Sequence, residues 1–346
     1  MTHGSVSGLP AWDDIAGAYK GSALLLGNGA SLALSSKFRY DSLFEQAKLA
    51  GSLSPEDVSL FEELDADCNF EYVLRSLAVA EPVIKVLCRD APSVRARYES
   101  VRDALFKAVN ENHATHKDVK RHFQGLSDHL RATYHSVFTL SYDLILYWAM
   151  MWWIDQDKKA REHLFEDFYR GPKTPAFTPA PAVNNVEAHG ATAVFYLHGG
   201  LHLYQPTGGF VSKRTSGIGA NLLAQFGRSV DGEDVLPVFV SEGHADKKVR
   251  SIAHNTYLSF AYEQLRSCES PIVLFGAELN PRYDDHIICA LARHKRRHIA
   301  ISLYDVKSVN ALKNRQDDYV ARFRKHGIHE HWLRFYDAST HPLGQL

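Results

Sequence analysis

Short aliphatic runs, each followed by turn or helix-capping residues, are the feature that most constrains the fold of this 346-residue chain. Continuous apolar runs, unlike alternating ones, are typical of strands that helices cover on both faces. The pattern therefore predicts an α/β fold with a Rossmann-like, doubly wound and mostly parallel sheet. The predicted strands are "ALLL" (23–26), "SVFT" (136–139), "VFYLH" (194–198), "LPVFV" (236–240), "PIVLFG" (271–276), "IAISLY" (299–304) and "WLRFY" (332–336).

A long stretch without any such run follows the first predicted strand. Residues 41–130 read as successive helices, with Ser54 as N-cap before Pro55 and with Asn69 capping the apolar segment that ends near residue 87. We therefore expect a helical subdomain, residues 41–130, inserted into a single nucleotide-binding domain that spans residues 1–346. The Pro-rich segment 172–185 predicts a lid or an exposed connection.

Composition excludes several classes of function. The 39 basic and 40 acidic residues nearly cancel, which argues against nucleic-acid binding and against a polybasic membrane anchor. The N-terminus lacks the pattern of a secretion signal, and we expect no membrane span, so a soluble, cytoplasmic protein is predicted.

Metal binding is considered because the chain contains 19 histidines. His113 with His116, and His198 with His202, have spacings that suit two zinc ligands, but neither pair has thiolates or an obvious third ligand nearby. The four cysteines, Cys68, Cys88, Cys268 and Cys289, form no close pair. We therefore predict no metal.

Residues just past each predicted strand are the candidates for a site, because ligands of such sheets bind at the carboxyl ends of the strands. The first strand leads into the glycine turn 27–31, whose main-chain N–H groups suit a diphosphate, although a turn of this kind is equally common as plain structure. The polar or glycine residues at the other ends are Thr139, Ser141, Asp143, His198, Gly199, Ser241, Glu242, Gly276 and Glu278. We expect these ends to ring one crevice.

This series resembles the sirtuin-like family, in the same order along the chain. "GNGAS" resembles the family's Gly-Ala-Gly-x-Ser loop, and Phe38-Arg39 resembles the Phe-Arg near the nicotinamide ribose. "TLSYD", "LHG", "VFVSEG" and "FGAEL" resemble, in turn, the family's Thr-Gln-Asn-Ile-Asp segment, catalytic-histidine stretch, Phe-Gly-Glu strand end and Gly-Thr-Ser-Leu loop. The prokaryotic sirtuin-related NAD hydrolases of anti-phage defence are more similar than the deacylases.

Two departures from the family pattern stand out. The four-cysteine zinc module of the deacylases is missing, which weighs against protein deacetylation. Ser141 stands where the family has its catalytic asparagine, and a hydroxyl cannot offer an amide's separate donor and acceptor. The chain either tolerates serine, uses a neighbouring residue, or is impaired or engineered at this position.

The resemblance implies a role for each candidate residue. His198 is the expected base, with Ser141 and Asp143 orienting water and ribose. The expected nucleotide-binding residues are Gly27, Asn28, Gly29, Ala30, Ser31, Phe38, Arg39, Thr139, Gly199, Glu242, Gly276 and Glu278. Purely structural alternatives stay open: Asp143 as the cap of the helix that follows it, His198 as a strand-end histidine, Phe38 as a core residue, and Tyr147, Trp148, Trp152 and Trp153 as core or oligomer interface.

Three functions from different classes remain open. The first is an NAD hydrolase that yields nicotinamide and ADP-ribose, acting as a regulated effector of anti-phage defence by NAD depletion. The second is a non-catalytic subunit that binds NAD or ADP-ribose, and the third is an interaction scaffold. Because a constitutive NAD hydrolase would poison its host, the resemblance leads us to expect control by homo-oligomerisation or by a separate activator protein.

Overall fold

The computed structural model describes residues 8–38, 42–87, 91–156, 165–171, 175–179, 190–206, 209–215, 222–226, 235–240 and 243–346. Its centre is a seven-stranded sheet in the order β12-β11-β10-β1-β2-β6-β3, and every neighbouring pair is parallel. The strands are β1 (Ser22–Leu26), β2 (Tyr134–Thr139), β3 (Phe165–Glu166), β6 (Thr192–Tyr196), β10 (Ile272–Phe275), β11 (Ile299–Leu303) and β12 (Leu333–Asp337). The predicted parallel α/β sheet is confirmed.

The sheet winds outward from its centre in two directions. The chain passes from β1 to β2 and β6 on one side of the sheet, and from β10 to β11 and β12 on the other. β1 and β10 are therefore neighbours, and the connections that follow them lead to opposite edges of the sheet. Leu25 of β1 lies between Leu274 of β10 and Phe138 of β2, and all three side chains are buried. The β1–β10 boundary is thus the topological switch point, where such sheets leave a crevice for a ligand.

One predicted strand belongs to a different sheet. The run 236–240 forms β9 (Val235–Phe239), which pairs antiparallel with β7 (Gly199–Pro206) in a second, five-stranded sheet ordered β4-β5-β8-β7-β9. Pro237 lacks an N–H, which suits β9 to the edge position that it occupies. The other members are β4 (Tyr169–Arg170), β5 (Ala176–Phe177) and β8 (Ser212–Lys213). Apart from residues 175–179, which include β5, the Pro-rich segment 172–185 lies outside the described residues.

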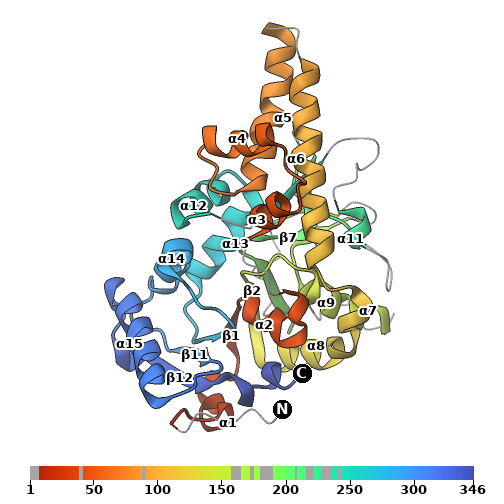
Figure 1. Cartoon of the computed structure of the whole chain (residues 1–346). Coiled ribbons are helices and arrows are strands. Elements are labelled where there is room, and N and C mark those ends of the chain that lie inside the picture. The colour runs from red at the N-terminus through yellow and green to blue at the C-terminus, as the bar shows by residue number, and fades with distance from the viewer. Residues whose placement is uncertain are drawn as a thin grey trace.

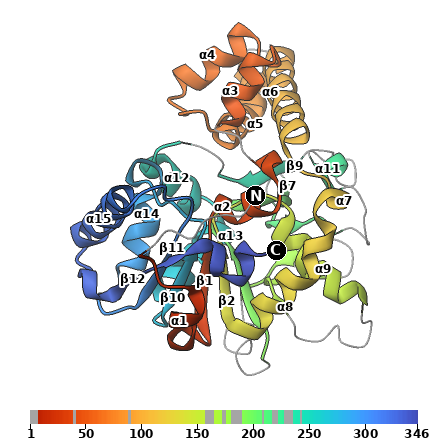
Figure 2. The same cartoon turned by 60° about the horizontal axis from the view of Figure 1, so that its bottom comes forward.

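Helices surround the main sheet (Figures 1 and 2). Their bounds are α1 (Trp12–Ile15), α2 (Asn28–Leu34), α3 (Leu43–Leu49), α4 (Pro55–Glu63), α5 (Phe70–Leu87), α6 (Ala91–Asn112), α7 (His116–Val119), α8 (Phe123–Thr133), α9 (Ile145–Gln156), α11 (Leu222–Gln225), α12 (Ala245–Ala253), α13 (Thr256–Ser267), α14 (Pro281–Leu291) and α15 (Val309–Lys325). Short 3₁₀ turns are η1 (Ala16–Tyr19), η2 (Ser36–Phe38), η3 (Lys120–His122), η5 (Glu330–Trp332), η6 (Ala338–Thr340) and η7 (Pro342–Gly344). None of these described helices has the length and apolar character needed to cross a bilayer.

The helices between β1 and β2 confirm the inserted helical segment. The paired helices α5 and α6 project from the body of the molecule, with α3 and α4 packed beside them (Figure 1). Both predicted caps are present: the Ser54 hydroxyl accepts the Asp57 N–H at 3.2 Å, and the Asn69 side chain accepts the Tyr72 N–H at 3.1 Å. Helix α8 instead packs on β2 and α9. The bounds 41–130 of a separate subdomain stay a prediction.

Candidate functional site

A cleft of about 990 Å³ opens at the carboxyl ends of the central strands. It is lined on one side by the turn after β1, including Gly27 and Gly29, and on another by His198, which follows β6. Further lining comes from the ends of β10 and β11 and from α12, α14 and α15. Ligand pockets commonly measure about 300–1,000 Å³, so this cleft is large enough for an extended small molecule.

The glycines of the first turn allow two strand ends to touch. A Cβ at Gly27 would lie 2.3 Å from the Gly276 carbonyl oxygen, and one at Gly29 would lie 2.7 Å from Gly276 Cα. Gly276 itself has φ +64°, in the left-handed region that favours glycine. These three glycines are therefore needed for packing between the β1 and β10 ends, whatever the cleft binds.

Three main-chain N–H groups of this turn, those of Gly27, Gly29 and Ala30, already have partners. Gly27 N donates to the Phe275 carbonyl at 3.0 Å, Gly29 N donates to the Gly276 carbonyl at 2.9 Å, and Ala30 N donates to the Gly27 carbonyl at 3.0 Å. The Asn28 side chain donates to the Phe38 carbonyl at 3.2 Å. In this conformation the turn offers a ligand its shape more than its hydrogen-bond donors.

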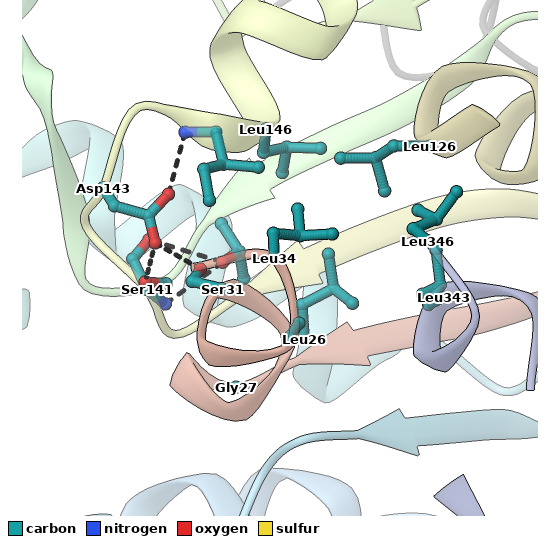
Figure 3. A pocket seen from close by; sticks show the side chains of 13 residues that line it. Leu26, Gly27, Ser31, Leu34, Leu126, Ser141, Asp143, Leu146, Leu343 and Leu346 are labelled. Carbon is teal, nitrogen blue, oxygen red and sulfur yellow. Dashed lines mark hydrogen bonds between the residues drawn. The ribbon is translucent and has the colours of Figure 1, made fainter. Parts of the chain in front are cut away.

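A second, much smaller pocket of about 30 Å³ lies behind the turn (Figure 3). The predicted residues Ser31, Thr139, Ser141 and Asp143 line it together with leucines. Those leucines are Leu26, Leu34, Leu126, Leu146, Leu343 and Leu346. A cavity of roughly 150 Å³ accommodates a six-membered ring, so this pocket has room for water but not for a nicotinamide ring.

The polar wall of the small pocket is built around Asp143, which is buried. One carboxylate oxygen accepts hydrogen bonds from the Ser31 and Ser141 hydroxyls, the latter at 2.5 Å, and the other accepts the Ile145 N–H at 2.8 Å (Figure 3). Asp143 therefore caps α9, as the structural alternative proposed, and also joins the two serines. Because the Ser141 hydroxyl donates to Asp143, it can offer only its lone pairs to the cleft.

His198 is buried and faces a second histidine. Its Nε2 lies 3.1 Å from Nε2 of His286, and its ring also hydrogen-bonds the Leu140 carbonyl. Because Nε2 faces His286, Nδ1–H makes the bond to Leu140. His198 Nε2 is then the acceptor and His286 Nε2–H the donor, so His198 carries its basic lone pair on Nε2.

Burial and a nearby cation keep both imidazoles neutral. Burial lowers the pKa of His198 well below its ordinary value, and the charge of Lys248 and the His286 ring lower it further. The pKa of His286 falls to about 3, again mainly through burial and then through Lys248. A neutral imidazole can accept a proton, but this pair does so readily only once an anionic group lies nearby.

Lys248 is a cleft-lining residue that the sequence analysis missed. It lies on α12, is only 6% exposed, and its ammonium contacts Asp284 Oδ1 at 3.3 Å. Burial raises the pKa of Asp284, while Lys248 lowers it. Lys248, Ser251 and Ile252 form the buried face of α12, so helical periodicity was the only sequence signal for this lysine.

The predicted site residues divide between the two pockets. Gly27, Asn28, Gly29, Ser141, His198, Gly276 and Glu278 line the large cleft. Ala30, Ser31, Thr139 and Asp143 line the small pocket, which Gly27 and Ser141 share.

The remaining predicted residues line neither pocket or are not described. Phe38 is fully buried against the His113 ring, and Gly199 begins β7 with φ +74°. Arg39 and Glu242 lie outside the described residues, as does Ser241.

Within the described part of the chain, no group of three or more His, Cys, Asp and Glu side chains is arranged to hold a metal ion. His113 accepts the Leu144 N–H and bonds the Ala114 carbonyl, and His202 lies between the Tyr147 and Tyr196 rings.

Comparison with models of known protein families identifies the family of this chain. A family model described as "Domain of unknown function (DUF4917)" matches residues 24–342, nearly the whole chain. The chain belongs to this family. The match to DUF4917 runs from β1 to the last 3₁₀ turn and so includes both pockets. None of the curated proteins matches this DUF4917 chain significantly.

Solved structures resemble the DUF4917 chain at low identity. One, described as "Structural Basis for the Mechanism and Regulation of Sir2 Enzymes", has 9% identity and a TM-score of 0.39, covering 96% of this chain and 92% of its own. Two mutants of a Sir2 homologue in complex with ADP ribose have 12% identity and TM-scores of 0.36 and 0.35, each covering 90% of this chain and 96% of its own. The fold class of this chain follows from the strand order of its own sheet.

Proposed function

We propose that this chain binds NAD in the large cleft and hydrolyses the bond between nicotinamide and ribose. The observation that carries the proposal is that one cleft at the switch point is lined by both Gly29 and His198. The glycine turn and the histidine were predicted from strand ends far apart in the sequence, and the motif resemblance assigned them to the same dinucleotide. The cleft volume also suits such a ligand.

The proposed reaction breaks the C1′–N bond of NAD and forms a C1′–O bond to water. Nicotinamide is cationic in NAD and leaves as a neutral amide base, so no general acid is required. The ribose becomes oxocarbenium-like, and water supplies the new oxygen while its proton passes to a base. The products are nicotinamide, ADP-ribose and one proton.

The residues of the cleft have matching roles in this proposal. His198 Nε2 accepts the proton from water or from a ribose hydroxyl once the substrate displaces the His286 contact. Ser141 accepts a hydrogen bond from water or ribose, and Asp143 holds Ser141 in place. Gly276 and Glu278 border the adenosine end.

Incubating purified protein with NAD tests the proposal directly. We expect release of nicotinamide and ADP-ribose, identified by mass spectrometry, and we expect His198→Ala to lower the rate by at least about 100-fold, the usual minimum for a general base. The exposed histidine variant His331→Ala serves as the control and should keep the wild-type rate. Cyclic ADP-ribose as the main product would instead indicate cyclisation, and wild-type turnover by His198→Ala would contradict the assigned base.

The surroundings of Ser141 favour a second candidate, a subunit that binds NAD or ADP-ribose without turnover. Ser141 replaces an amide, its hydroxyl proton is used by Asp143, and the pocket behind it is too small for nicotinamide. Tight ADP-ribose binding without any nicotinamide release would support this candidate. Activity that appears in Ser141→Asn, with the wild-type protein inactive, would trace the loss to this single position.

The resemblance further suggests a cytoplasmic effector of anti-phage defence that depletes NAD. Such an enzyme needs control, and we propose that oligomerisation or an activator protein supplies it. Rate measurements over a range of protein concentrations, combined with sedimentation, test this point. Full activity of the isolated monomer would contradict it.

A further inference from the structure

The cleft contains a buried cation, Lys248, that has no role in the reaction proposed above. Lys248 projects from α12 into the same cleft as His198, and its only ion-pair partner among the described residues is Asp284. A lysine is rarely buried without strong pairing, because an ammonium that leaves water loses its hydration. The position of Lys248 therefore requires a compensating anion.

Asp284 compensates this charge poorly. The contact of 3.3 Å is longer than the 2.7–2.9 Å, approximately, of a strong charge-assisted hydrogen bond. Burial also raises the pKa of Asp284, which weakens its hold as an anion. Asp284 has φ −132° and ψ 17° inside α14, so the helix is locally broken where this carboxyl meets Lys248.

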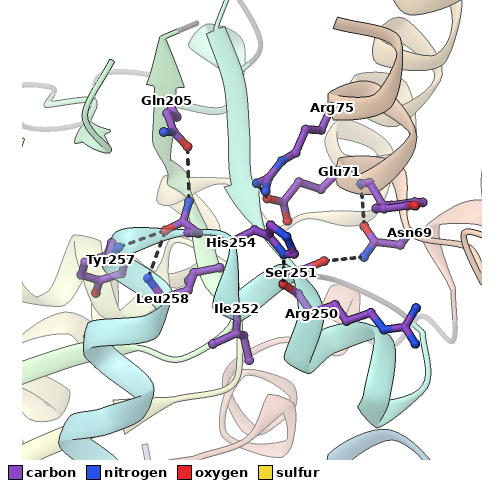
Figure 4. Close-up of polar contacts among 12 residues, drawn as sticks. Asn69, Glu71, Arg75, Gln205, Arg250, Ser251, Ile252, His254, Tyr257 and Leu258 are labelled. Atoms are coloured by element: carbon purple, nitrogen blue, oxygen red, sulfur yellow. Dashed lines mark hydrogen bonds and ion pairs between the residues drawn. The ribbon is translucent and has the colours of Figure 1, made fainter. Parts of the chain in front are cut away.

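Helix α12, which carries Lys248, is hydrogen-bonded to the helical insertion; Figure 4 shows the contact between Asn69 and Ser251. Ser251, one turn further along, accepts a hydrogen bond from Asn69 of the helical insertion at 3.4 Å. At the start of α12, the main-chain N–H and the ring of His244 both donate to Asp67 of the same insertion. A preorganised cation in a cleft favours an anionic ligand more than a mobile surface lysine does.

We propose that Lys248 binds a diphosphate oxygen of the dinucleotide, so that a side chain on α12, and not the glycine turn alone, neutralises the phosphates. The N–H groups of Gly27, Gly29 and Ala30 already donate to carbonyls, so the turn has few donors left. Arg315 also lines the cleft, but it is exposed, whereas Lys248 is buried next to His198. This inference rests on the proposed binding of a dinucleotide in the cleft.

Phosphate binding at Lys248 would also serve the chemistry. A bare ammonium near the ribose opposes the positive charge that develops on the sugar, and the same ammonium suppresses protonation of His198 and His286. A bound phosphate neutralises Lys248 and removes both effects. A ligand therefore makes His198 a stronger base only if it carries a diphosphate that neutralises Lys248.

Calorimetric titration of the full chain with ADP-ribose, adenosine and inorganic pyrophosphate tests the assignment. We expect Lys248→Met to weaken ADP-ribose and pyrophosphate binding at least about 10-fold, the usual loss of a charged hydrogen bond, and to leave adenosine binding unchanged. Lys247→Met is the matched control, because Lys247 is the neighbouring lysine, pairs with Asp65 and does not line the cleft. It should leave all three affinities within about two-fold of wild type.

Two further variants keep the test decisive if Lys248→Met fails to fold. Lys248→Arg retains the cation and should retain ADP-ribose binding, whereas Lys248→Gln should lose it. The inference would be overturned if a folded Lys248→Met or Lys248→Gln protein bound ADP-ribose as tightly as wild type. It would also be overturned if adenosine binding fell as much as ADP-ribose binding, or if the wild-type protein bound neither ADP-ribose nor pyrophosphate.

The outcomes also separate this inference from the proposed hydrolysis. ADP-ribose binding that depends on Lys248, without nicotinamide release, would leave the phosphate site intact and reject the hydrolase. Hydrolysis by Lys248→Met with unchanged kcat/KM would support the hydrolase and reject the phosphate site at Lys248.

Discussion

At Gly276 two strand ends approach so closely that no side chain fits between them. A Cβ there would lie 2.4 Å from Ala30 N, and φ is +64°. We expect Gly276→Ala to lower the free energy of unfolding by several kcal/mol, because the left-handed conformation costs an L-residue roughly 1–2 kcal/mol and the main-chain overlap adds to that cost. Urea unfolding of the purified variant measures the change.

Gly21 provides the control for this substitution. It has a similar φ of +68°, but nothing lies within 4 Å of an added Cβ. Gly21→Ala therefore reports the conformational cost alone, roughly 1–2 kcal/mol. Equal losses of unfolding free energy in the two variants would show that the β1 and β10 ends move apart at little cost to accommodate an added Cβ.

Among the elements, α12 is where the helical insertion meets the cleft. Asp65, Asp67 and Cys68 of the insertion all have positive φ, so this loop holds three residues in a conformation that normally favours glycine. Asp67 accepts two hydrogen bonds from His244 at the start of α12. The strained loop is thus tied to the helix that carries Lys248.

We predict that Asp67→Asn lowers the free energy of unfolding by about 1–2 kcal/mol, because it removes the charge from two hydrogen bonds while keeping a residue that tolerates positive φ. It should also weaken ADP-ribose binding by loosening α12. Chemical unfolding and calorimetric titration measure the two effects.

Asp65→Asn is the matched control. The Asp65 side chain is 81% exposed, and its ion pair with Lys247 lies at the surface, where such pairs contribute little. We expect both the stability and the affinity of Asp65→Asn to stay near wild type. An Asp67→Asn protein that behaves in the same way would show that the junction does not support the cleft.

For the whole molecule, buried histidines set the response of stability to pH. Burial lowers the pKa of His129 to about 4 and those of His286 and His341 to about 3, and that of His198 also falls well below its ordinary value. Below pH 6.5, approximately, the unfolded chain protonates these groups while the folded chain does not. The free energy of unfolding should therefore fall as the pH decreases from about 6.5 to about 4.

Raised carboxyl pKa values oppose this trend without reversing it. Burial raises the pKa of Glu71 to about 7, so the folded chain binds that proton first and gains stability as the pH falls from about 7 towards the ordinary Glu value. Asp284 acts in the same direction. Four histidines outweigh these two groups, so urea unfolding should show lower stability at pH 5 than at pH 7. His129→Leu should reduce the difference, and a stability that rises towards pH 5 would contradict the balance.

Much of the architecture could be predicted because it is encoded locally. The runs 23–26 and 136–139, and residues 272–275 of the run 271–276, are strands because continuous aliphatic residues bury both faces. Ser54 and Asn69 begin helices because their side chains accept helical N–H groups. The strand-end rule also led to His198 and the glycine turn, which line one cleft. The binding roles of these residues stay predictions.

The sequence by itself determined where most strands and helices lie, since each depends on neighbours within a few positions. Only the tertiary structure decided that β9 joins the second sheet, that three donors of the glycine turn are occupied, and that Lys248 lies buried beside His198. Each of these facts depends on contacts between residues that are distant in sequence, and a local pattern carries no information about which distant groups will remove a side chain from water.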